Sequence, residues 1–215
     1  ILALSYVSNT LGTINPVKDI IAAARKINPQ IVVVVDAAQA APHMQIDVQD
    51  LGCDFLAFSS HKMLGPTGVG VLWGRYQLLE KMSPYQFGGE MIREVTLEST
   101  LYKEPPHKFE AGTPNISGVI ALKAAIQYLE NVGFDAIRSH EMALVAKAEK
   151  RLVEEFGDAL TFYHPESLEH RAGILTFTFK KIHPHDLAQV LNDDAISIRA
   201  GHHCTQPVSY THLTL

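Results

Sequence analysis

Residues 31–39 read IVVVVDAAQ, and this stretch decides the fold. Five β-branched residues stop abruptly at Asp36, and a second apolar run at 55–58 stops in the same way at Ser59-Ser60-His61-Lys62. Apolar runs without alternation are typical of strands buried on both faces, as in parallel sheets. The carboxyl ends of such strands meet at one edge of the sheet, where open α/β folds bind ligands. The sequence therefore predicts a ligand site at this edge, built from the polar residues that follow the two strands.

The chain before this stretch predicts a strand–helix–strand unit. Residues 1–7 are expected to form a buried strand that ends at Ser8-Asn9, on the same edge as Asp36. Asn15 is a suitable N-cap and Pro16 a suitable first residue for the helix that follows, which Asn28-Pro29 would end. With the strand at 31–35, this order is that of an α/β fold with a mostly parallel sheet.

The chain after Lys62 predicts a change of architecture. A Gly-rich run contains a strand at 69–73, and the irregular segment 75–110, with a strand near 95–97, is expected to be functional or interfacial. Two amphipathic helices, short strands and a third helix then predict a smaller α+β domain. We expect one domain over residues 1–116, and a linking helix with the small domain over 117–215. The elements expected in this second part are helices at 117–129, 134–156 and 183–191 and strands at 160–163 and 174–179.

The polar residues at the predicted edge match the functional groups of one kind of cofactor. A carboxylate such as Asp36 can hold a protonated ring nitrogen and make the ring an electron sink. The amine of Lys62 can condense with an aldehyde, and Ser hydroxyls with His61 can hold phosphate oxygens. Taken singly, a Lys after a strand is usually a solvated surface residue, and an Asp at a strand end usually forms a turn. Their order and spacing together favour a cofactor with a pyridine ring, a phosphate and an aldehyde.

Two sets of residues carry a family resemblance. The segments VDAAQA at 35–40 and SSHK at 59–62 resemble the pyridoxal-phosphate core of class V aminotransferases. The segment RAGHHC at 199–204 resembles the active-cysteine segment of one branch, the group II cysteine desulfurases and selenocysteine lyases. The similarity runs from residue 1 to about residue 207. It implies a type I pyridoxal-phosphate fold, in which residues 1–116 are the C-terminal part of the large cofactor-binding domain.

The resemblance implies a role for the residues around the cofactor ring. Lys62 would carry the pyridoxal phosphate and then act as the base that takes the Cα proton of the substrate. Asp36 would keep the ring nitrogen protonated, and Gln39 would hydrogen-bond the ring oxygen. Asn9, which taken alone is as well explained as a turn former, would face the cofactor and the substrate carboxylate.

Further residues are assigned to the phosphate by resemblance. Ser59 and His61 would hold it, and Thr113 would be donated to the site of the neighbouring subunit in a homodimer. Taken alone, Thr113 is also a suitable N-cap for a helix that starts near Pro114. Ser60 stands where the family commonly has Gly, so it is given no role.

Cys204 is the sulfur acceptor that the resemblance implies. The expected reaction converts L-cysteine to L-alanine and leaves a persulfide on this residue, for delivery to a sulfur-acceptor protein and to iron–sulfur cluster assembly or other uses. A thiolate is the nucleophile in such chemistry, and Arg199, His202 and His203 lie close enough in sequence to favour it. Arg199 and His203 are therefore placed in the substrate site. Cys53 has apolar neighbours and is expected to be a buried structural thiol.

Three alternatives remain open from the sequence. A selenocysteine lyase, acting on L-selenocysteine, would share these residues, and an aminotransferase of the same family would share Asp36 and Lys62 without a use for Cys204. The third is an inactive fragment, because the chain opens with Ile1 inside an apolar segment and residues 208–215 resemble foreign sequence. By resemblance, the aromatic residue that stacks on the cofactor lies upstream of Ile1, and the arginine that binds the substrate carboxylate lies beyond the similarity.

Composition narrows the classes of protein further. With 47% hydrophobic and 19% charged residues the chain is typical of a soluble globular protein, and its net charge of −5 gives no basic surface for nucleic acid. No apolar run reaches the roughly 18 residues that span a bilayer. Two cysteines fit neither a disulfide framework nor a zinc motif and favour a cytoplasmic setting. The pairs His183/His185 and His202/His203 lack zinc-helix spacing, so we expect no metal.

Overall fold

The computed structural model describes residues 1–213 as two compact units. The first unit contains Ile1–Tyr6 and Pro16–Gly133, and the second contains Val7–Asn15 and the described residues from Phe134 onward. The units thus divide the chain after Gly133, and a short segment near the N-terminus belongs to the second unit. The expected boundary after residue 116 concerns the domains of the complete family fold and stays a prediction.

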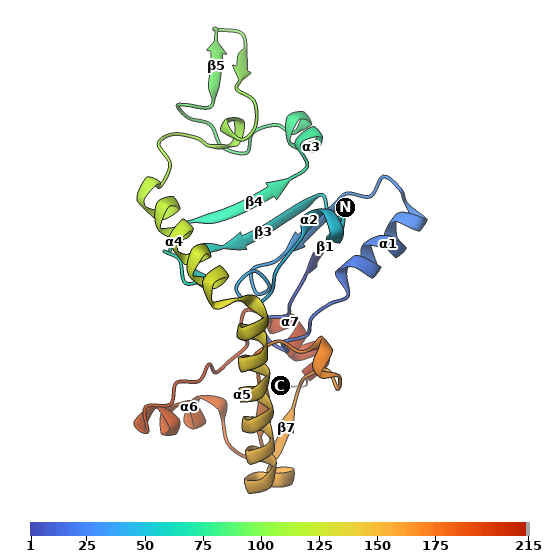
Figure 1. Cartoon of the computed structure of the whole chain (residues 1–215), viewed down its shortest axis with the longest axis vertical. Helices are drawn as coiled ribbons and strands as arrows, with labels where there is room; N and C mark the ends of the chain where they lie inside the picture. The colour runs from blue at the N-terminus through green and yellow to red at the C-terminus, as the bar shows by residue number, and fades with distance from the viewer. Residues whose placement is uncertain (214–215) are drawn as a thin grey trace. The chain divides into compact units, whose positions relative to one another are not determined.

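The first unit is built on a four-stranded sheet in the order β1-β2-β3-β4 (Figure 1). Strand β1 is Leu2–Ser5, β2 is Val33–Asp36, β3 is Phe55–Ser59 and β4 is Gly70–Gly74. β1, β2 and β3 are parallel neighbours, and β4 is antiparallel to β3. The predicted α/β fold with a mostly parallel sheet is therefore confirmed.

The two faces of this sheet are covered unequally. The side chains of Val33 and Val35 point to one face and are fully buried. On the opposite face, Ala3 and Val34 are register partners, yet Ala3 is exposed and Val34 is half-buried. Leu72 of β4 is 58% exposed on that same face. The prediction of strands buried on both faces was wrong for β1 and β2, because a parallel sheet is buried on both sides only where covering layers lie on both, but it holds at the start of β3, where Phe55 and Leu56 are both buried.

Helix α1, Val17–Ile27, connects β1 to β2. Its N-cap position is occupied by Pro16, which cannot supply a capping side chain, so the prediction of Asn15 as N-cap was wrong. The helix ends at Asn28, as predicted. Val17 and Ile21 are its buried residues and form the stripe that contacts the rest of the unit.

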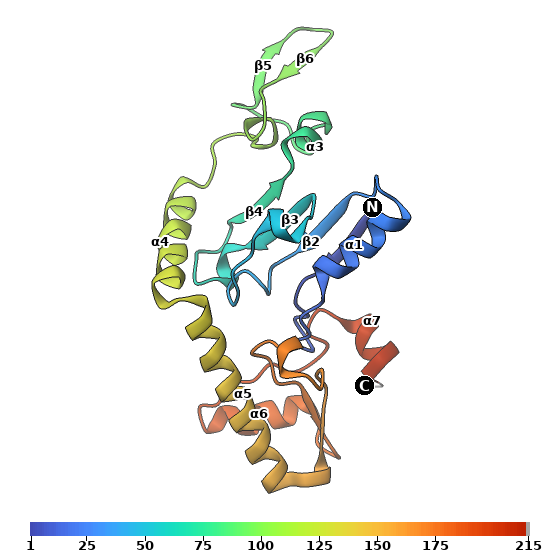
Figure 2. The same cartoon turned by 45° about the vertical axis from the view of Figure 1, so that its right-hand side comes forward.

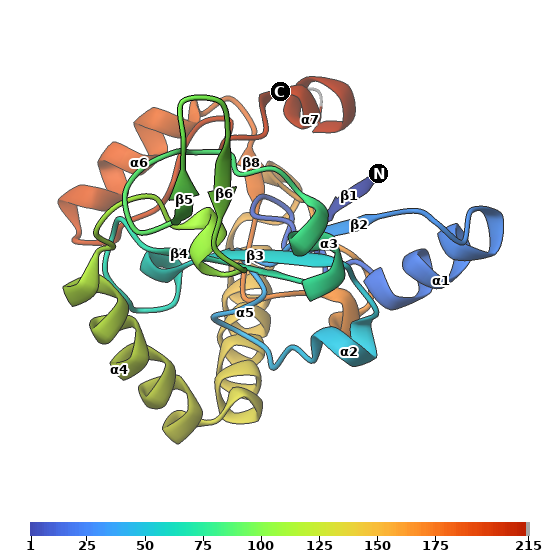
Figure 3. The same ribbon diagram turned by 90° about the horizontal axis from the view of Figure 1, so that it is seen from above.

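A short helix, α2 (Val48–Leu51), was not predicted. Asp47 caps it by accepting hydrogen bonds from the backbone N–H groups of Gln49 and Asp50. Gly52 ends it with a left-handed φ of 77°, a conformation that glycine adopts at no steric cost. An exposed ion pair between Lys18 and Asp50 joins α1 to α2, which lie side by side in Figure 3.

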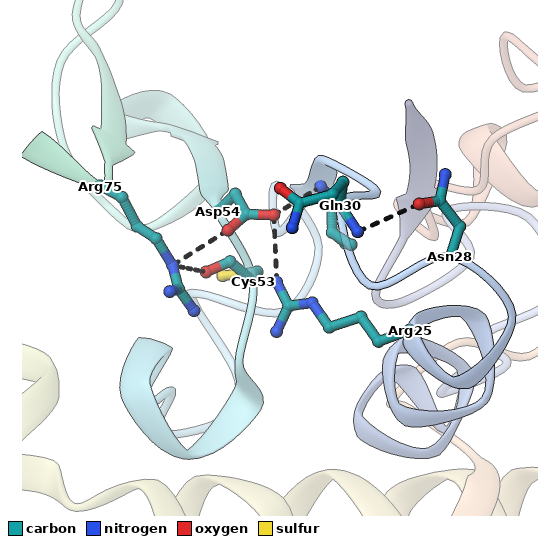
Figure 4. A network of polar contacts seen from close by, with 7 residues as sticks. Arg25, Asn28, Gln30, Cys53, Asp54 and Arg75 are labelled. Carbon is teal, nitrogen blue, oxygen red and sulfur yellow. Dashed lines mark hydrogen bonds and ion pairs between the residues drawn. The ribbon is translucent and has the colours of Figure 1, made fainter. Parts of the chain in front are cut away.

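A buried carboxylate, Asp54, joins four elements at the amino-terminal edge of the sheet (Figure 4). Its Oδ2 accepts a hydrogen bond from the backbone N–H of Val33 at 2.8 Å and pairs with Arg25 at 3.0 Å. Its Oδ1 pairs with Nε of Arg75 at 3.0 Å, just after β4. α1, β2, β3 and β4 therefore share one anchoring group, on the edge opposite to the predicted ligand site.

We expect Asp54→Ala to destabilise the first unit by about 3 kcal/mol, because it leaves two guanidinium groups and a strand N–H without their partner. The partial exposure of both arginines keeps the loss at the lower end of the range for buried pairs. The matched control is Asp50→Ala, where the carboxylate is 66% exposed and the expected loss is below about 1 kcal/mol. Urea unfolding followed by the fluorescence of Trp73, the only tryptophan, measures both. Equal losses in the two variants would contradict the anchoring role.

The segment after β4 is more regular than predicted. Helix α3 (Tyr76–Lys81) is followed by an antiparallel hairpin of β5 (Ile92–Val95) and β6 (Thr100–Tyr102), which lies beyond α3 in Figure 2. The strand expected near 95–97 lies three residues earlier, since β5 ends at Val95 and residues 96–97 begin the turn of the hairpin, and the second strand of the hairpin was not predicted. Helix α4 (Ile116–Val132) closes the unit.

The second unit contains a long helix, a two-stranded ladder and a shorter helix. α5 spans Phe134–Phe156, as predicted. Antiparallel β7 (Leu160–Phe162) and β8 (Phe177–Phe179) are shorter than predicted, and Phe179 packs edge-to-face against Phe156 of α5 with ring centroids 5.2 Å apart. α6 (Pro184–Asp193) follows the N-cap residue His183, at the place where a helix was predicted over 183–191. α7 (Gln206–Val208) and a π-helical turn (Ser209–Leu213) follow; the foreign origin of residues 208–215 stays a prediction, and residues 214–215 lie outside the described chain.

An ion-pair cluster fixes the loop after β7 to α5. Glu149 of α5 pairs with the buried Arg171 at 2.7 Å and with His164 at 3.1 Å. Burial alone would raise the pKa of Glu149, but the hydrogen bond and charge of Arg171, with those of His164, lower it below the ordinary value of 4.5. The charged form of Glu149 therefore stabilises the folded unit at neutral pH.

We expect this contribution to disappear as the pH falls through and below 4.5, because the unfolded chain then binds the proton more readily than the folded one. Glu149→Gln should lower protection of the β7 and β8 amides from hydrogen exchange at pH 7 by about 2–3 kcal/mol, since Arg171 stays buried without its partner. The gap between variant and wild type should shrink towards pH 3. A gap that is constant from pH 7 to pH 3 would show that Glu149 acts without its charge.

Candidate active site

The carboxyl ends of β2 and β3 form one edge of the sheet in the first unit. Asp36, the last residue of β2, pairs in register with Ala57 of β3, which ends two residues later at Ser59. The Asp36 side chain is exposed, and its Oδ1 accepts a hydrogen bond from the backbone N–H of Ala38 at 2.9 Å. Among residues 1–213 this bond leaves Oδ2 of the carboxylate free to receive a ligand at the predicted edge.

A tight turn after β3 presents the next two predicted residues. Ser60–Lys62 form a single 3-10 turn, in which the carbonyl of Ser60 accepts hydrogen bonds from the N–H groups of Met63 and Gly65. Ser60 is fully buried, and a Cβ at Gly65 would lie 2.1 Å from its Oγ, so only glycine fits at Gly65. His61 and Lys62 are exposed, and within residues 1–213 their side chains make no hydrogen bond or ion pair. The turn therefore offers an imidazole and an amine to a ligand.

Gln39 and Thr113 are the remaining predicted residues of this unit. Gln39 is half-buried in the turn that follows β2. Thr113 is exposed and lies two residues before Asn115, whose Oδ1 accepts a hydrogen bond from the N–H of Gly118 and caps α4. The expectation that Thr113 could be the N-cap was therefore wrong. The place of Thr113 in the site of a neighbouring subunit stays a prediction.

The groups at this edge fit pyridoxal phosphate in their chemistry. An exposed carboxylate, an amide, hydroxyl groups, an imidazole and an amine match a ring nitrogen, a ring oxygen, a phosphate and an aldehyde. None of the described residues occupies Lys62 or His61 with a competing contact. The residues that form this set are Asp36, Gln39, Ser59, His61 and Lys62.

The second unit holds Cys204 on an exposed loop. Nη2 of Arg199 donates a hydrogen bond to Sγ of Cys204 at 3.2 Å. Gly201, His203 and Cys204 all have positive φ, of 105°, 52° and 64°. The guanidinium therefore places a positive charge beside an exposed sulfur, the reactive atom of a cysteine nucleophile.

Asn9 belongs to the same unit and holds this loop. Its Nδ2 donates a hydrogen bond to the carbonyl of His203 at 2.5 Å. The structure thus brings together the predicted substrate-site residues Asn9, Arg199 and His203 with Cys204. Burial, followed by the charges of Arg199 and His202, lowers the pKa of His203, so its imidazole is neutral at pH 7. The contact of Asn9 with the cofactor stays a prediction.

Two residues of this loop region were missed by sequence reasoning. Thr10 is 2% exposed, and its Oγ1 lies 2.7 Å from Oγ1 of Thr205. A threonine next to a predicted site residue gives no signal in a single sequence, because its partner is 195 positions away.

Cys53 is fully buried, as predicted, and burial raises the pKa of its thiol.

Among residues 1–213, no group of three or more His, Cys, Asp or Glu side chains is arranged to hold a metal ion. No helix in this part of the chain combines the length and the apolar character that crossing a bilayer requires.

Sequence comparisons with known proteins find one family and one group of enzymes within it. The sequence model of the class-V aminotransferase family matches residues 1–214. A probable cysteine desulfurase of Halalkalibacterium halodurans is 54% identical over 208 residues, which cover 97% of this chain and 50% of that protein. A cysteine desulfurase of Haloferax volcanii is 44% identical over 207 residues, which cover 96% and 47%.

Solved structures agree with the sequence comparison. The apo cysteine desulfurase of Thermococcus onnurineus NA1 superposes with a TM-score of 0.88 at 40% identity, covering 97% of this chain and 51% of that one. The cysteine desulfurase CsdA of Escherichia coli superposes with a TM-score of 0.90 at 38% identity, covering 97% and 50%. The chain spans about half the length of the curated relatives it matches.

Proposed function

Because the chain belongs to the class-V aminotransferase family, we propose that it serves as part of a pyridoxal-phosphate-dependent cysteine desulfurase, which converts L-cysteine to L-alanine and transfers the sulfur to Cys204. One observation carries this choice within the family. Cys204 is an exposed thiol whose sulfur accepts a hydrogen bond from Arg199. An aminotransferase needs no nucleophilic sulfur, whereas a desulfurase needs one.

The first unit would bind the cofactor. When bound, pyridoxal phosphate supplies an electron sink for the carbanion that forms at the substrate Cα. Asp36 would hold its ring nitrogen protonated, Gln39 would bind its ring oxygen, and Ser59 with His61 would hold its phosphate. Lys62 would attach the cofactor covalently, and its amine, once released, would take the proton from Cα of the substrate.

The second unit would perform the sulfur transfer. The Cys204 thiolate attacks Sγ of the substrate, an S–S bond forms, and the Cβ–Sγ bond of the substrate breaks. The electron pair of that bond stays with the carbon fragment, which takes up a proton at Cβ and one at Cα and leaves as alanine. L-cysteine and one thiol thus give L-alanine and one persulfide, and no other oxidant or reductant is required. Arg199 would hold its positive charge beside the sulfur of Cys204, and His203 would line the substrate site.

The experiment compares three reactions of the complete enzyme that contains this chain, loaded with pyridoxal phosphate. We expect L-cysteine to give equal amounts of alanine and protein-bound persulfide. Preference for L-selenocysteine without persulfide would favour a selenocysteine lyase, and amino transfer to a 2-oxo acid would favour an aminotransferase.

The isolated chain is expected to bind the cofactor weakly and to turn over little, because it spans half the length of its relatives. Robust alanine release by the isolated chain would contradict that expectation.

We also propose that the working enzyme is a homodimer with composite sites. Thr113 is exposed, and so are Tyr85, Phe87 and Leu97 around the β5–β6 hairpin, which is the apolar surface that a partner subunit would cover. The sulfur would pass from Cys204 to an acceptor protein for iron–sulfur cluster assembly or other uses, in the cytoplasm, where both cysteines stay free. Sedimentation as a monomer that still binds the cofactor tightly would contradict the dimer, and recovery in an extracytoplasmic fraction would contradict the compartment.

A further inference from the structure

We propose that Thr10 and Thr205 form a latch that holds residues 201–205, here called the sulfur loop, in the conformation that places Cys204 beside Arg199. Both threonines are positioning residues, because neither is assigned to the substrate or the cofactor. The relevance of the latch to sulfur transfer rests on the proposed function. The latch itself is a property of the second unit and is open to a test without any cofactor.

The backbone of the sulfur loop requires such support. His203 and Cys204 have φ values of 52° and 64°, in the left-handed region that residues with a Cβ rarely adopt. Two such residues in succession are energetically unfavourable and persist only where surrounding contacts fix them. Without those contacts, both residues would return to negative φ, and the sulfur of Cys204 would move away from Arg199.

The contacts that fix the loop form a chain of hydrogen bonds. Oγ1 of Thr205 donates to the carbonyl of His202 at 2.8 Å, and its single proton is then used. The short contact of 2.7 Å between the two threonine hydroxyls must therefore be a bond that Thr10 donates and Thr205 accepts. The backbone N–H of Thr205 also donates to the carbonyl of His202 at 2.7 Å. The hydroxyl of Thr10 thereby orients the hydroxyl of Thr205, which in turn holds the carbonyl of His202.

Thr10 is itself rigidly placed. It is 2% exposed, its N–H donates to Oγ of Ser8 at 3.3 Å, and its carbonyl accepts a hydrogen bond from Thr176. The neighbouring Asn9 donates to the carbonyl of His203. Two successive residues, Asn9 and Thr10, therefore control two successive carbonyls of the sulfur loop, directly in one case and through Thr205 in the other.

The consequence is a link between the latch and the chemistry of the thiol. While the loop is latched, Nη2 of Arg199 lies 3.2 Å from Sγ of Cys204 and holds a positive charge beside the sulfur that reacts. Breaking the latch should remove this donor without removing Arg199 or Cys204. A merely structural role for the threonines would leave the reactivity of an exposed thiol unchanged.

The first measurement is the rate at which iodoacetamide alkylates Cys204 in the chain without cofactor, read by peptide mass spectrometry. Cys53 is buried and serves as the internal reference. Thr205→Val and Thr10→Val should each slow alkylation at pH 7 about fivefold, the factor that one lost hydrogen bond commonly represents. The double variant should be no slower than the slower single variant, because both changes break the same chain of bonds. Thr205→Ser keeps the hydroxyl and should retain the wild-type rate, and Thr161→Val, an exposed threonine of β7, is the matched control.

The second measurement uses the complete enzyme loaded with pyridoxal phosphate. Thr205→Val should slow persulfide formation from L-cysteine while the cofactor absorbance and KM stay unchanged, and Thr205→Ser should restore the rate. Wild-type alkylation rates in both valine variants, or additive effects in the double variant, would overturn the latch. If alkylation follows the predicted pattern but the wild-type enzyme makes no persulfide, the latch stands and the desulfurase proposal fails.

Discussion

Replacing Lys62 by alanine is expected to abolish both the visible absorbance of covalently bound pyridoxal phosphate and all turnover of L-cysteine. The side chain is exposed on the turn that follows β3, and within the described residues nothing competes for its amine. It is the group that we propose both attaches the cofactor and moves the Cα proton, so no residual route remains. Absorbance spectroscopy after cofactor addition, with an alanine assay, measures both effects in the complete enzyme.

Two variants make this result specific to the amine. Lys62→Arg keeps the positive charge but cannot attach the cofactor in the same way, so it too should lack the visible band. Lys123→Ala removes an exposed lysine of α4 and should leave band and turnover unchanged. A normal band in Lys62→Ala would show that another amine carries the cofactor, and the proposed site at the end of β3 would be wrong.

Replacing Cys204 by alanine is expected to stop persulfide formation by at least about a thousandfold while leaving the cofactor absorbance intact, because removal of a nucleophile eliminates its step. Cys204 lies in the second unit, whereas Asp36, Ser59, His61 and Lys62 belong to the first. The loss of the thiol therefore removes no group that we assign to the cofactor. Cyanide-labile sulfur on the protein and the absorbance band are the two readouts.

The second cysteine provides the control for this prediction. Cys53→Ala should form persulfide at a rate close to that of the wild type, because its thiol is fully buried and burial disfavours its thiolate. Cys204→Ser should behave as Cys204→Ala does, since a serine hydroxyl is a poor sulfur acceptor. Persulfide at the normal rate in Cys204→Ala would remove the basis for choosing a desulfurase within the family.

The edge of the sheet was predictable because the relevant signal is local. The two apolar runs that form parallel strands each end at a polar residue, so the sequence alone predicted that Asp36 and Ser59 lie on one edge of the sheet. The observed register of β2 and β3 confirms this prediction. α5 was predicted with its observed bounds because a long amphipathic pattern lies between Gly133 and Gly157. α2 was missed because four residues carry too little periodicity, and its Asp47 cap is recognised only once the helix is known.

Features that depend on distant contacts could not be predicted. The left-handed conformation of His203 and Cys204 is imposed by Asn9, Thr10 and Thr205, and two of these lie nearly the whole chain away. Ala3 and Val34 are less buried than the residues on the other face of the sheet. This difference depends on which layers cover the sheet, and the sequences of the strands do not specify those layers. The sequence predicted that Arg199 lies close to Cys204. It could not predict that the guanidinium points at the sulfur and donates a hydrogen bond to it.

The most direct test of the central claim is the fate of the substrate sulfur in a single turnover. The complete enzyme, in excess over L-cysteine labelled with radioactive sulfur, would be quenched, digested and mapped by peptide. We predict one equivalent of alanine and the label on the peptide that contains Cys204. Alanine released while the label appears as free sulfide, or on a peptide that contains Cys53, would contradict the account.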